Sequence, residues 1–347
     1  MRSRIDRLLD GIGSDSTVLI SGYPNIFYYS GFRSEDAYLL ISRDEHILIT
    51  DSRYFIQARE QSPDFDIYDI EKGWDKLLGQ AESICIEENN MTVGFYEKLK
   101  HAAKGKSFRN AQKKINTPRR EKDSYEMKTI AHAESIGDAA FMHILDFMRA
   151  GMTERDVALE IEMYMKKQGA AALSFETIVA SGERGAMPHG VASDKIIKQG
   201  ELVTLDFGCV YEGYCSDMTR TVVMGTANEW QKEIYGIVLN AQETAISGLY
   251  SGIGCAAADA LARDVIANSG YGDKFGHSLG HSVGIEIHEN PCFSPKSKDT
   301  LGEGNVLSVE PGIYIEGLGG VRIEDLIAVS DGKIVNLTRS PKNLVQI

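Results

Sequence analysis

Residues 150–169, AGMTERDVALEIEMYMKKQG, decide the fold because the chain repeats their pattern at residues 251–270, SGIGCAAADALARDVIANSG. The two segments align without gaps, and each has glycine at its second and last positions with apolar residues at helical spacing between them. A second pair follows in the same order, because GELVTLDFG (200–208) aligns with GNVLSVEPG (304–312). The two offsets, 101 and 104 residues, are nearly constant, so the sequence predicts a duplicated helix–helix–hairpin unit.

The predicted copies cover residues 123–225 and 228–330. Duplicated units usually pack about a pseudo-twofold axis, so equivalent positions are expected to meet near the centre. Asp206 and Glu310 are such equivalents, and each ends an apolar strand pattern. Asp217 and Glu324 each lie one hairpin strand later in their copy. His189 and His288 are near-equivalents at an offset of 99. The duplication therefore predicts one cavity that gathers Asp206, Asp217, Glu310, Glu324, His189 and His288.

Four carboxylates in one cavity require protons or cations, because like charges a few ångströms apart destabilise one another. Carboxylate ligands with an imidazole suit Mn, Fe, Co or Zn, and four carboxylates are more than one such ion needs. The pattern therefore predicts a pair of divalent ions that activates a water. The alternative, a surface acid or an ion-paired acid, is weakest for Asp206 and Glu310. It stays open for Asp217, which has Arg220 close by.

The segment HSLGH (277–281) has histidines at the spacing of the zinc-binding H-E-x-x-H helix. Ser278 stands where that motif has its general base, and the neighbouring glycines favour a strand or bend. We therefore predict a single metal ligand here, His281, which leaves His277 and His288 for other roles. The glycines of GLGG (317–320) lack the Lys-Ser/Thr of a phosphate loop and are interpreted as a hairpin turn.

The composition excludes several classes of protein. With 347 residues, 43% of them apolar and 25% charged, the chain is typical of a two-domain globular protein. A net charge of −13 argues against a nucleic-acid partner. Five cysteines with no C-x-x-C pair form neither a disulfide framework nor a thiolate zinc site. Without an apolar signal core or a run of 18 apolar residues, we expect a cytoplasmic protein with no membrane partner.

The first third of the chain predicts an α/β domain. Asp51 is predicted to cap a helix over residues 52–61. Strands are predicted at residues 16–22, 38–42, 46–50, 65–70 and 92–96, the second and third of them as a hairpin. The polar stretch 117–126 marks the boundary between domains 1–120 and 121–347. A long helix is predicted from 123 to 148, and a second helix follows with Thr153 as its cap.

Five segments of the second domain resemble the signature sequences of the Xaa-Pro peptidases, aminopeptidase P and prolidase, which are pita-bread metallopeptidases. They are MPHGVASDK (187–195), TLDFGCVYEGYCSDMTRT (204–221), HSLGHSVGIEIHE (277–289), SVEPGIYIE (308–316) and GGVRIEDL (319–326). The first domain, with ITDSRYFIQA (49–58), is similar to the creatinase-like N-terminal domain of the same enzymes.

The resemblance implies a role for each of the metal-binding residues. Asp206 and His281 would bind different ions, and Asp217 and Glu324 would bridge the two. Glu310 would be both a ligand and the proton shuttle for the bridging water. The implied metal is Mn, with Co, Zn or Fe as alternatives.

The resemblance also implies the residues that act on the substrate. His189 and His288 would line the substrate site and stabilise the oxyanion or orient the peptide. Arg322 lies two residues before Glu324, on the same side of a strand, and would orient the acid. His277 is assigned to substrate binding, and so is Tyr314, for which packing in the core is an equal alternative.

The implied activity is that of an Xaa-Pro aminopeptidase, favoured because ASGERGAMPHG (180–190) and the short first domain resemble the small bacterial type. The substrates would be small peptides with proline second, and the enzyme would be a homodimer. A prolidase that splits Xaa-Pro dipeptides is the main alternative. A methionine aminopeptidase and a non-catalytic binding protein of the same fold are the others.

Overall fold

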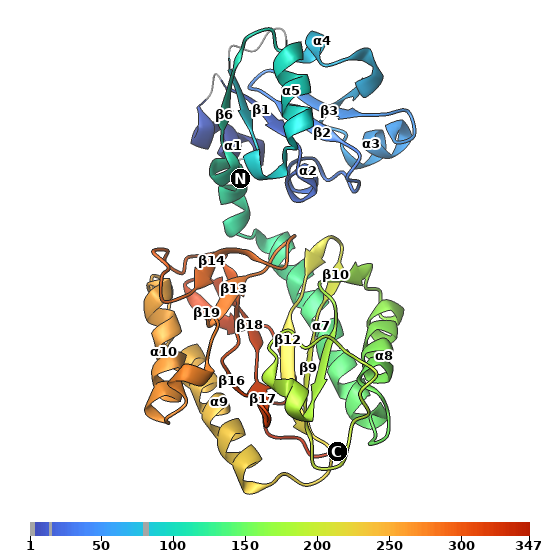
Figure 1. Ribbon diagram of the computed structural model, residues 1–347. Helices are drawn as coiled ribbons and strands as arrows, with labels where there is room; N and C mark the ends of the chain where they lie inside the picture. The colour runs from blue at the N-terminus through green and yellow to red at the C-terminus, as the bar shows by residue number, and fades with distance from the viewer. Residues whose placement is uncertain (1–3, 14–15, 79–82) are drawn as a thin grey trace. The chain divides into compact units, whose positions relative to one another are not determined.

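The computed structural model describes residues 4–13, 16–78 and 83–347, and it divides into two compact units, Met1–Arg119 and Arg120–Ile347 (Figure 1). The division falls inside the polar stretch 117–126, where the short 3₁₀ helix η3 (Thr117–Arg120) lies. Each unit has a hydrophobic core of its own.

The first unit is built on a six-stranded sheet with the order β4-β3-β2-β1-β5-β6. Strands β1, β2 and β3 are antiparallel neighbours, and the outer strands pair in parallel. The strands are β1 Thr17–Ile20, β2 Tyr38–Ile41, β3 His46–Thr50, β4 Asp66–Asp69, β5 Ser83–Ile86 and β6 Ser107–Asn110. The helices are α1 Arg4–Ile12, α2 Tyr23–Ser30, α3 Phe55–Gln61, α4 Asp75–Leu78, α5 Val93–Ala102 and α6 Gln112–Asn116, with η1 Ile70–Lys72 and η2 Glu88–Asn90. The predicted hairpin of residues 38–50 is confirmed.

Two local predictions for this unit are wrong. Asp51 does not cap α3, because its carboxylate accepts hydrogen bonds from the backbone and guanidinium of Arg53, and the helix begins only at Phe55. Residues 92–96 form no strand. Thr92 Oγ1 accepts a hydrogen bond from the Phe95 backbone N–H (3.2 Å) and so starts α5. A local cap outweighs the β-propensity of the aromatic residues here.

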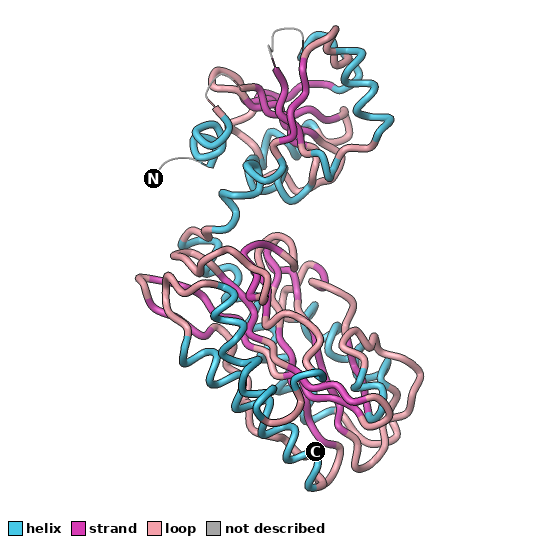
Figure 2. The backbone as a smooth tube through the Cα atoms, turned by 60° about the vertical axis from the view of Figure 1, so that its left-hand side comes forward, coloured by secondary structure: helices cyan, strands magenta, loops and turns pink. Residues whose placement is uncertain are grey.

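The second unit contains the two predicted helix pairs. They are α7 Ser124–Phe147 with α8 Glu154–Lys167, and α9 Glu229–Gly248 with α10 Cys255–Asn268. Capping boxes begin three of these helices, at Asp123, Thr153 and Asn228, as the sequence predicted for the second. Figure 1 shows the two pairs on opposite sides of the strands, and Figure 2 shows the strands of this unit, in magenta, between helices in cyan.

Two antiparallel hairpins occupy corresponding places in the two copies. Strand β9 pairs with β12, with Asp206 opposite Thr219, and β15 pairs with β18, with Val309 opposite Asp325. The first copy has β7 Ala172–Leu173, β8 Ile178–Ser181, η4 Gly182–Ala186, β9 Leu202–Phe207, β10 Cys209–Tyr211, β11 Tyr214–Cys215 and β12 Met218–Val223. The second has η5 Gly272–Lys274, β13 Gly280–Ser282, β14 Glu289–Phe293, β15 Val306–Val309, β16 Gly312–Ile315, β17 Gly319–Arg322, β18 Asp325–Ser330 and β19 Lys333–Asn336. The aligned segments 200–208 and 304–312 thus contain β9 and β15, which confirms the duplication.

Candidate metal centre and active site

A cavity of about 680 Å³ lies where the two hairpins meet. Its lining includes nine of the residues predicted for the site, which are Asp206, Asp217, His281, Glu310, Glu324, His189, His277, His288 and Arg322. Tyr314 lies behind this lining, in contact with His277 and Arg322. The structure therefore brings residues from positions 189 to 324 of the chain into one place, with acids from both copies.

The candidate metal ligands approach one another closely. His281 Nε2 lies 3.5 Å from Asp217 Oδ2 and 3.5 Å from Glu310 Oε1. One ligand atom each of Asp217, His281 and Glu324 lie within 4.8 Å of one another. Asp206 enters from β9, with its Oδ2 accepting a hydrogen bond of 2.6 Å from Arg322 Nη2. The spacing suits donors that share divalent cations.

Two buried carboxylate oxygens of this group test whether the residues fit a cation. Asp206 Oδ1 and Glu324 Oε1 have no hydrogen-bond partner among the described residues, although the second oxygen of each carboxylate is bonded. Buried polar atoms are almost always satisfied in folded proteins. Both orphaned atoms are negatively charged acceptors at the wall of the cavity, so a cation is the group that fits them.

The electrostatics of the carboxylates agree with that fit. Burial raises the pKa of Asp217 well above its usual value, and the charges of Glu324 and Asp206 raise it further. Burial also raises the pKa of Glu324, and it raises that of Glu310 to about 8 against the opposing effect of Arg322. Without a cation, these acids therefore resist carrying their charges together.

His281 is held in the form that binds metals. Burial, followed by the neighbouring His288, lowers the pKa of His281 to about 4, so the ring is neutral. Its Nδ1 lies 3.3 Å from the carbonyl oxygen of Ser282, which assigns the proton to Nδ1 and leaves the Nε2 lone pair facing the carboxylates. The segment is the short strand β13 rather than a zinc-type helix, as the glycines predicted.

Arg322 connects the two halves of the site. Its guanidinium donates to Asp206 Oδ2 and, at 3.1 Å, to Thr219 Oγ1, which in turn donates to Glu324 Oε2 at 2.8 Å. Nη1 of Arg322 donates to the Tyr314 hydroxyl at 2.9 Å. The arginine thus orients one candidate ligand from each copy.

The histidines outside the ligand group take two different positions. His277 is mostly buried, burial lowers its pKa to about 4, and its Nε2 lies 2.8 Å from the Tyr314 hydroxyl. His189 and His288 are exposed on the cavity wall, and the ring of His288 lies 4.4 Å from that of His281. These two imidazoles are the most exposed of the four that line the cavity.

Sequence reasoning missed two hydroxyl groups that support the ligands. Thr219 binds Glu324, and Ser308 Oγ donates to Glu310 Oε1 (3.1 Å) and accepts from the His281 backbone N–H (3.1 Å). Each lies two residues from a candidate ligand, in SDMT and SVE. The two-residue period of a strand could have identified both, because it places such pairs on one face. The apolar wall, with Phe175 and Ile287, left no comparable signal.

The geometry defines a site suited to divalent metal ions, and comparisons with known proteins define the class, a metal-dependent hydrolase, and the family. Residues 128–331 match Metallopeptidase family M24, and residues 2–120 match the Creatinase/Prolidase N-terminal domain. An Xaa-Pro dipeptidase of Pyrococcus horikoshii is 40% identical over 350 residues, which cover 99% of each chain. The structure of an Xaa-Pro dipeptidase from Bacillus anthracis is similar with a TM-score of 0.95 and 42% identity, over 99% of each chain. That of an X-Pro aminopeptidase from Thermotoga maritima has a TM-score of 0.91 and 37% identity, over 100% of each chain.

The chain therefore belongs to metallopeptidase family M24. It combines a creatinase/prolidase N-terminal domain with a pita-bread catalytic domain, and the predicted resemblance and fold class are confirmed. Among the described residues, no helix is both long enough and apolar enough to span a membrane.

Proposed function

We propose that the protein hydrolyses the peptide bond between an N-terminal residue and proline, with two divalent metal ions held by Asp206, Asp217, His281, Glu310 and Glu324. The observation that carries the proposal is the convergence of three carboxylates, those of Asp217, Glu310 and Glu324, on His281. Asp206 lines the same cavity, and two buried carboxylate oxygens of the group have no hydrogen-bond partner among the described residues. Dipeptides are the proposed substrates, because the similar proteins from P. horikoshii and B. anthracis are Xaa-Pro dipeptidases. This changes the expectation from sequence, which favoured the aminopeptidase.

An Xaa-Pro aminopeptidase is the second candidate, supported by the likeness to the T. maritima enzyme. The two activities differ in whether the substrate ends at proline. Mn is the metal that we would test first, and a homodimer is the oligomeric state that we expect from the family resemblance.

The chain's own residues suggest how the reaction proceeds. The bound metal pair would supply an acidified water and polarise the scissile carbonyl. Glu310, held by Ser308, would take the proton of the attacking water at its carboxylate and pass it to the proline nitrogen. His189 and His288 face the cavity and would donate hydrogen bonds to the developing oxyanion.

The proline side of the substrate also fits the cavity. A bond before proline has no N–H, so recognition has to come from elsewhere. Phe175, Val191 and Ile287 give the wall an apolar surface suited to a pyrrolidine ring.

The test compares hydrolysis of Ala-Pro with that of Ala-Pro-Ala by the full-length protein after treatment with a chelator and reloading with Mn. Ala-Ala serves as the control peptide. Turnover of Ala-Pro alone supports the dipeptidase, and cleavage of Ala-Pro-Ala to alanine and the dipeptide Pro-Ala supports the aminopeptidase. Turnover of neither proline peptide by protein with bound metal, or undiminished activity in excess chelator, would refute the proposal.

A further inference from the structure

The exposed His189 lies in a segment that has little regular structure to hold it. Residues 181–193 run from the end of β8 through η4 and then through turns to Ser193. We call this segment the His189 loop. Because the ring of His189 is exposed and lies on the cavity wall, packing does not fix it, and its position depends on the backbone of the loop.

One buried carboxylate fastens both ends of the His189 loop. Glu154, the first residue of α8, has a side chain with no exposed surface. Its Oε1 accepts hydrogen bonds from the backbone N–H and the hydroxyl of Ser181, both at 2.8 Å. Its Oε2 accepts from the backbone N–H (3.1 Å) and the hydroxyl (2.6 Å) of Ser193, and from Arg184 Nε (2.9 Å). Glu154 thus joins the first residue, the last residue and an internal cation of the loop.

Further contacts carry this fastening to the residues beside His189. Arg184 Nη2 donates to the Val191 carbonyl at 2.6 Å, and Arg322 Nη1 donates to the Pro188 carbonyl at 3.2 Å. Gly190 packs so closely that an added Cβ would lie 3.0 Å from the Cβ of Ala180. The backbone is therefore fixed on both sides of His189, by Glu154 through Arg184 and by Arg322.

We propose that Glu154 is a positioning residue for His189, and that its carboxylate holds the imidazole at the place where the substrate carbonyl binds. The inference rests on the proposed function, which gives His189 its role. The negative charge is required because five donors converge on two oxygens. A glutamine of the same shape would turn an N–H group towards some of these donors, and buried donors would lose their partners.

The test is a double-mutant cycle on the metal-loaded, full-length protein with an Xaa-Pro peptide, using Glu154→Gln, His189→Ala and the double variant. A displaced catalytic group commonly costs about 10- to 100-fold in rate, so we expect Glu154→Gln to lower kcat/KM by about tenfold or more. In the His189→Ala background, the same change is expected to cost less than about twofold, because the group that it positions is gone. The Kd for Mn should stay unchanged, since Glu154 contacts none of the candidate ligands in the contacts above.

A matched control separates positioning from general stability. Val157→Ala removes buried apolar atoms from the same helix and leaves the five hydrogen bonds of Glu154 to the His189 loop in place. We expect it to lower the melting temperature, to leave kcat/KM within about twofold, and to have the same small effect with or without His189. If Glu154→Gln fails to fold, Ser193→Ala removes one of the five bonds and replaces it in the cycle.

Each outcome of the cycle has one meaning. If the losses of kcat/KM caused by Glu154→Gln and His189→Ala multiply in the double variant, the inference is overturned while the proposed function stands. A normal kcat/KM for Glu154→Gln would overturn the inference in the same way. Normal kcat/KM for His189→Ala would remove the role of His189 and the inference with it. A wild-type protein that binds Mn but hydrolyses no Xaa-Pro peptide would overturn the proposed function itself.

Discussion

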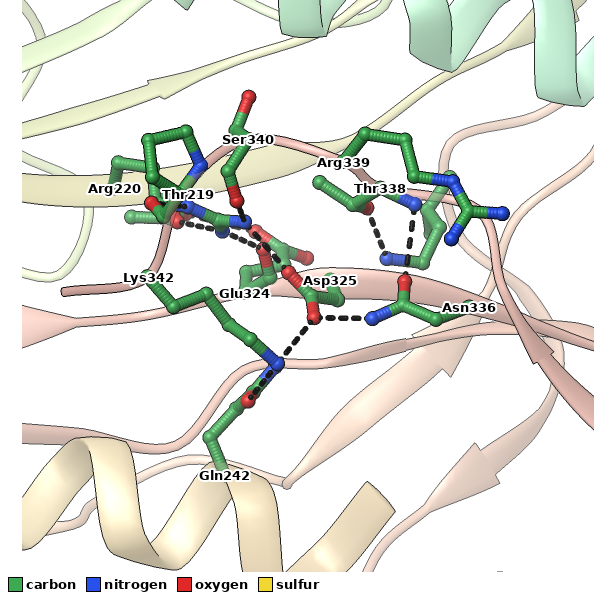
Figure 3. A network of polar contacts seen from close by, with 12 residues as sticks. Thr219, Arg220, Gln242, Glu324, Asp325, Asn336, Thr338, Arg339, Ser340 and Lys342 are labelled. Atoms are coloured by element: carbon green, nitrogen blue, oxygen red, sulfur yellow. Dashed lines mark hydrogen bonds and ion pairs between the residues drawn. The ribbon is translucent and has the colours of Figure 1, made fainter. Parts of the chain in front are cut away.

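Replacing Asp325 by asparagine should destabilise the protein strongly, because it breaks a buried charge network next to the candidate metal ligand Glu324 (Figure 3). Asp325 Oδ1 accepts a hydrogen bond of 2.8 Å from Arg220 Nη2, and the two side chains are 0% and 1% exposed. Asp325 Oδ2 accepts from Asn336 Nδ2 (2.6 Å) and Lys342 Nζ (3.0 Å). The substitution keeps the shape of the side chain and removes its charge.

The magnitude follows from the partners that remain. Removing one member of a buried ion pair costs about 3–5 kcal/mol, because the other charge is left unpaired. The other bonds of Arg220 go to carbonyl oxygens, including those of Thr219 and Glu324, which carry no net charge. The amide N–H group of the substituted side chain would also face side chains that donate hydrogen bonds to Asp325, namely Arg220, Asn336 and Lys342. We therefore expect a loss of about 4 kcal/mol, which for a domain of this size lowers the melting temperature by about 10 °C.

Thermal unfolding and metal titration measure both consequences of Asp325→Asn. Arg220 binds the backbone of Glu324, so the affinity for Mn should also fall, by about tenfold or more, as for other lost supports of metal ligands. Glu229→Gln is the control, because its pair with Lys232 is exposed and should leave the melting temperature unchanged within error. A melting temperature within about 2 °C of wild type for Asp325→Asn would refute the argument.

Four further predictions concern the site and the strands around it. Glu310→Ala should lower kcat by at least about 10³-fold in steady-state assays, because one change removes a ligand and the proton carrier; near-normal turnover would exclude both roles. Gly320→Ala should lower the free energy of unfolding by about 1–3 kcal/mol, measured by thermal unfolding, because the added Cβ would lie 2.9 Å from the Ile313 carbonyl oxygen. Gly236→Ala is the control and should not destabilise, because no atom lies within 4 Å of its added Cβ. His288→Ala should lower kcat and leave Mn bound, as measured by elemental analysis. Glu289→Gln should reduce kcat/KM in the protein that has His288 and should have no further effect in the His288→Ala variant. Loss of Mn from His288→Ala would instead make that histidine a ligand.

The sequence predicted those parts of the fold that depend on local or repeated patterns. The helix pairs follow from periodicity and from caps such as Thr153, and the two hairpins follow from the duplication. The acids could be predicted for the same reason, because each ends or follows a strand of the repeat. Residues 92–96 combine a helix cap at Thr92 with residues typical of strands. The cap was decisive, so the strand predicted there was wrong.

The long-range contacts of Arg220 and Glu154 could not be predicted, because their partners lie far apart in the sequence and follow no period. Arg220 meets Asp325 across 105 residues, and Glu154 meets Ser193 across 39. A charged residue at such a position looks like an ordinary solvent-facing one until the fold is known. The apolar wall was hidden for the opposite reason, because an apolar residue in a loop resembles one in the core.

In both copies a buried carboxylate holds the loop that carries an exposed cavity histidine, but the carboxylate comes from a different place in each copy. In the first copy the buried Glu154, at the start of α8, holds the His189 loop. In the second copy the equivalent helix position is Cys255, which offers no carboxylate. There Glu289, with a side chain only 6% exposed, pairs with Lys122 at 3.2 Å and accepts hydrogen bonds from the backbone of residues 285 and 286, just before His288. Each exposed imidazole thus lies in a loop whose backbone a buried acid holds, although the acid comes from a different element in each copy. This is expected if the acid serves to position the imidazole and not to stabilise one helix.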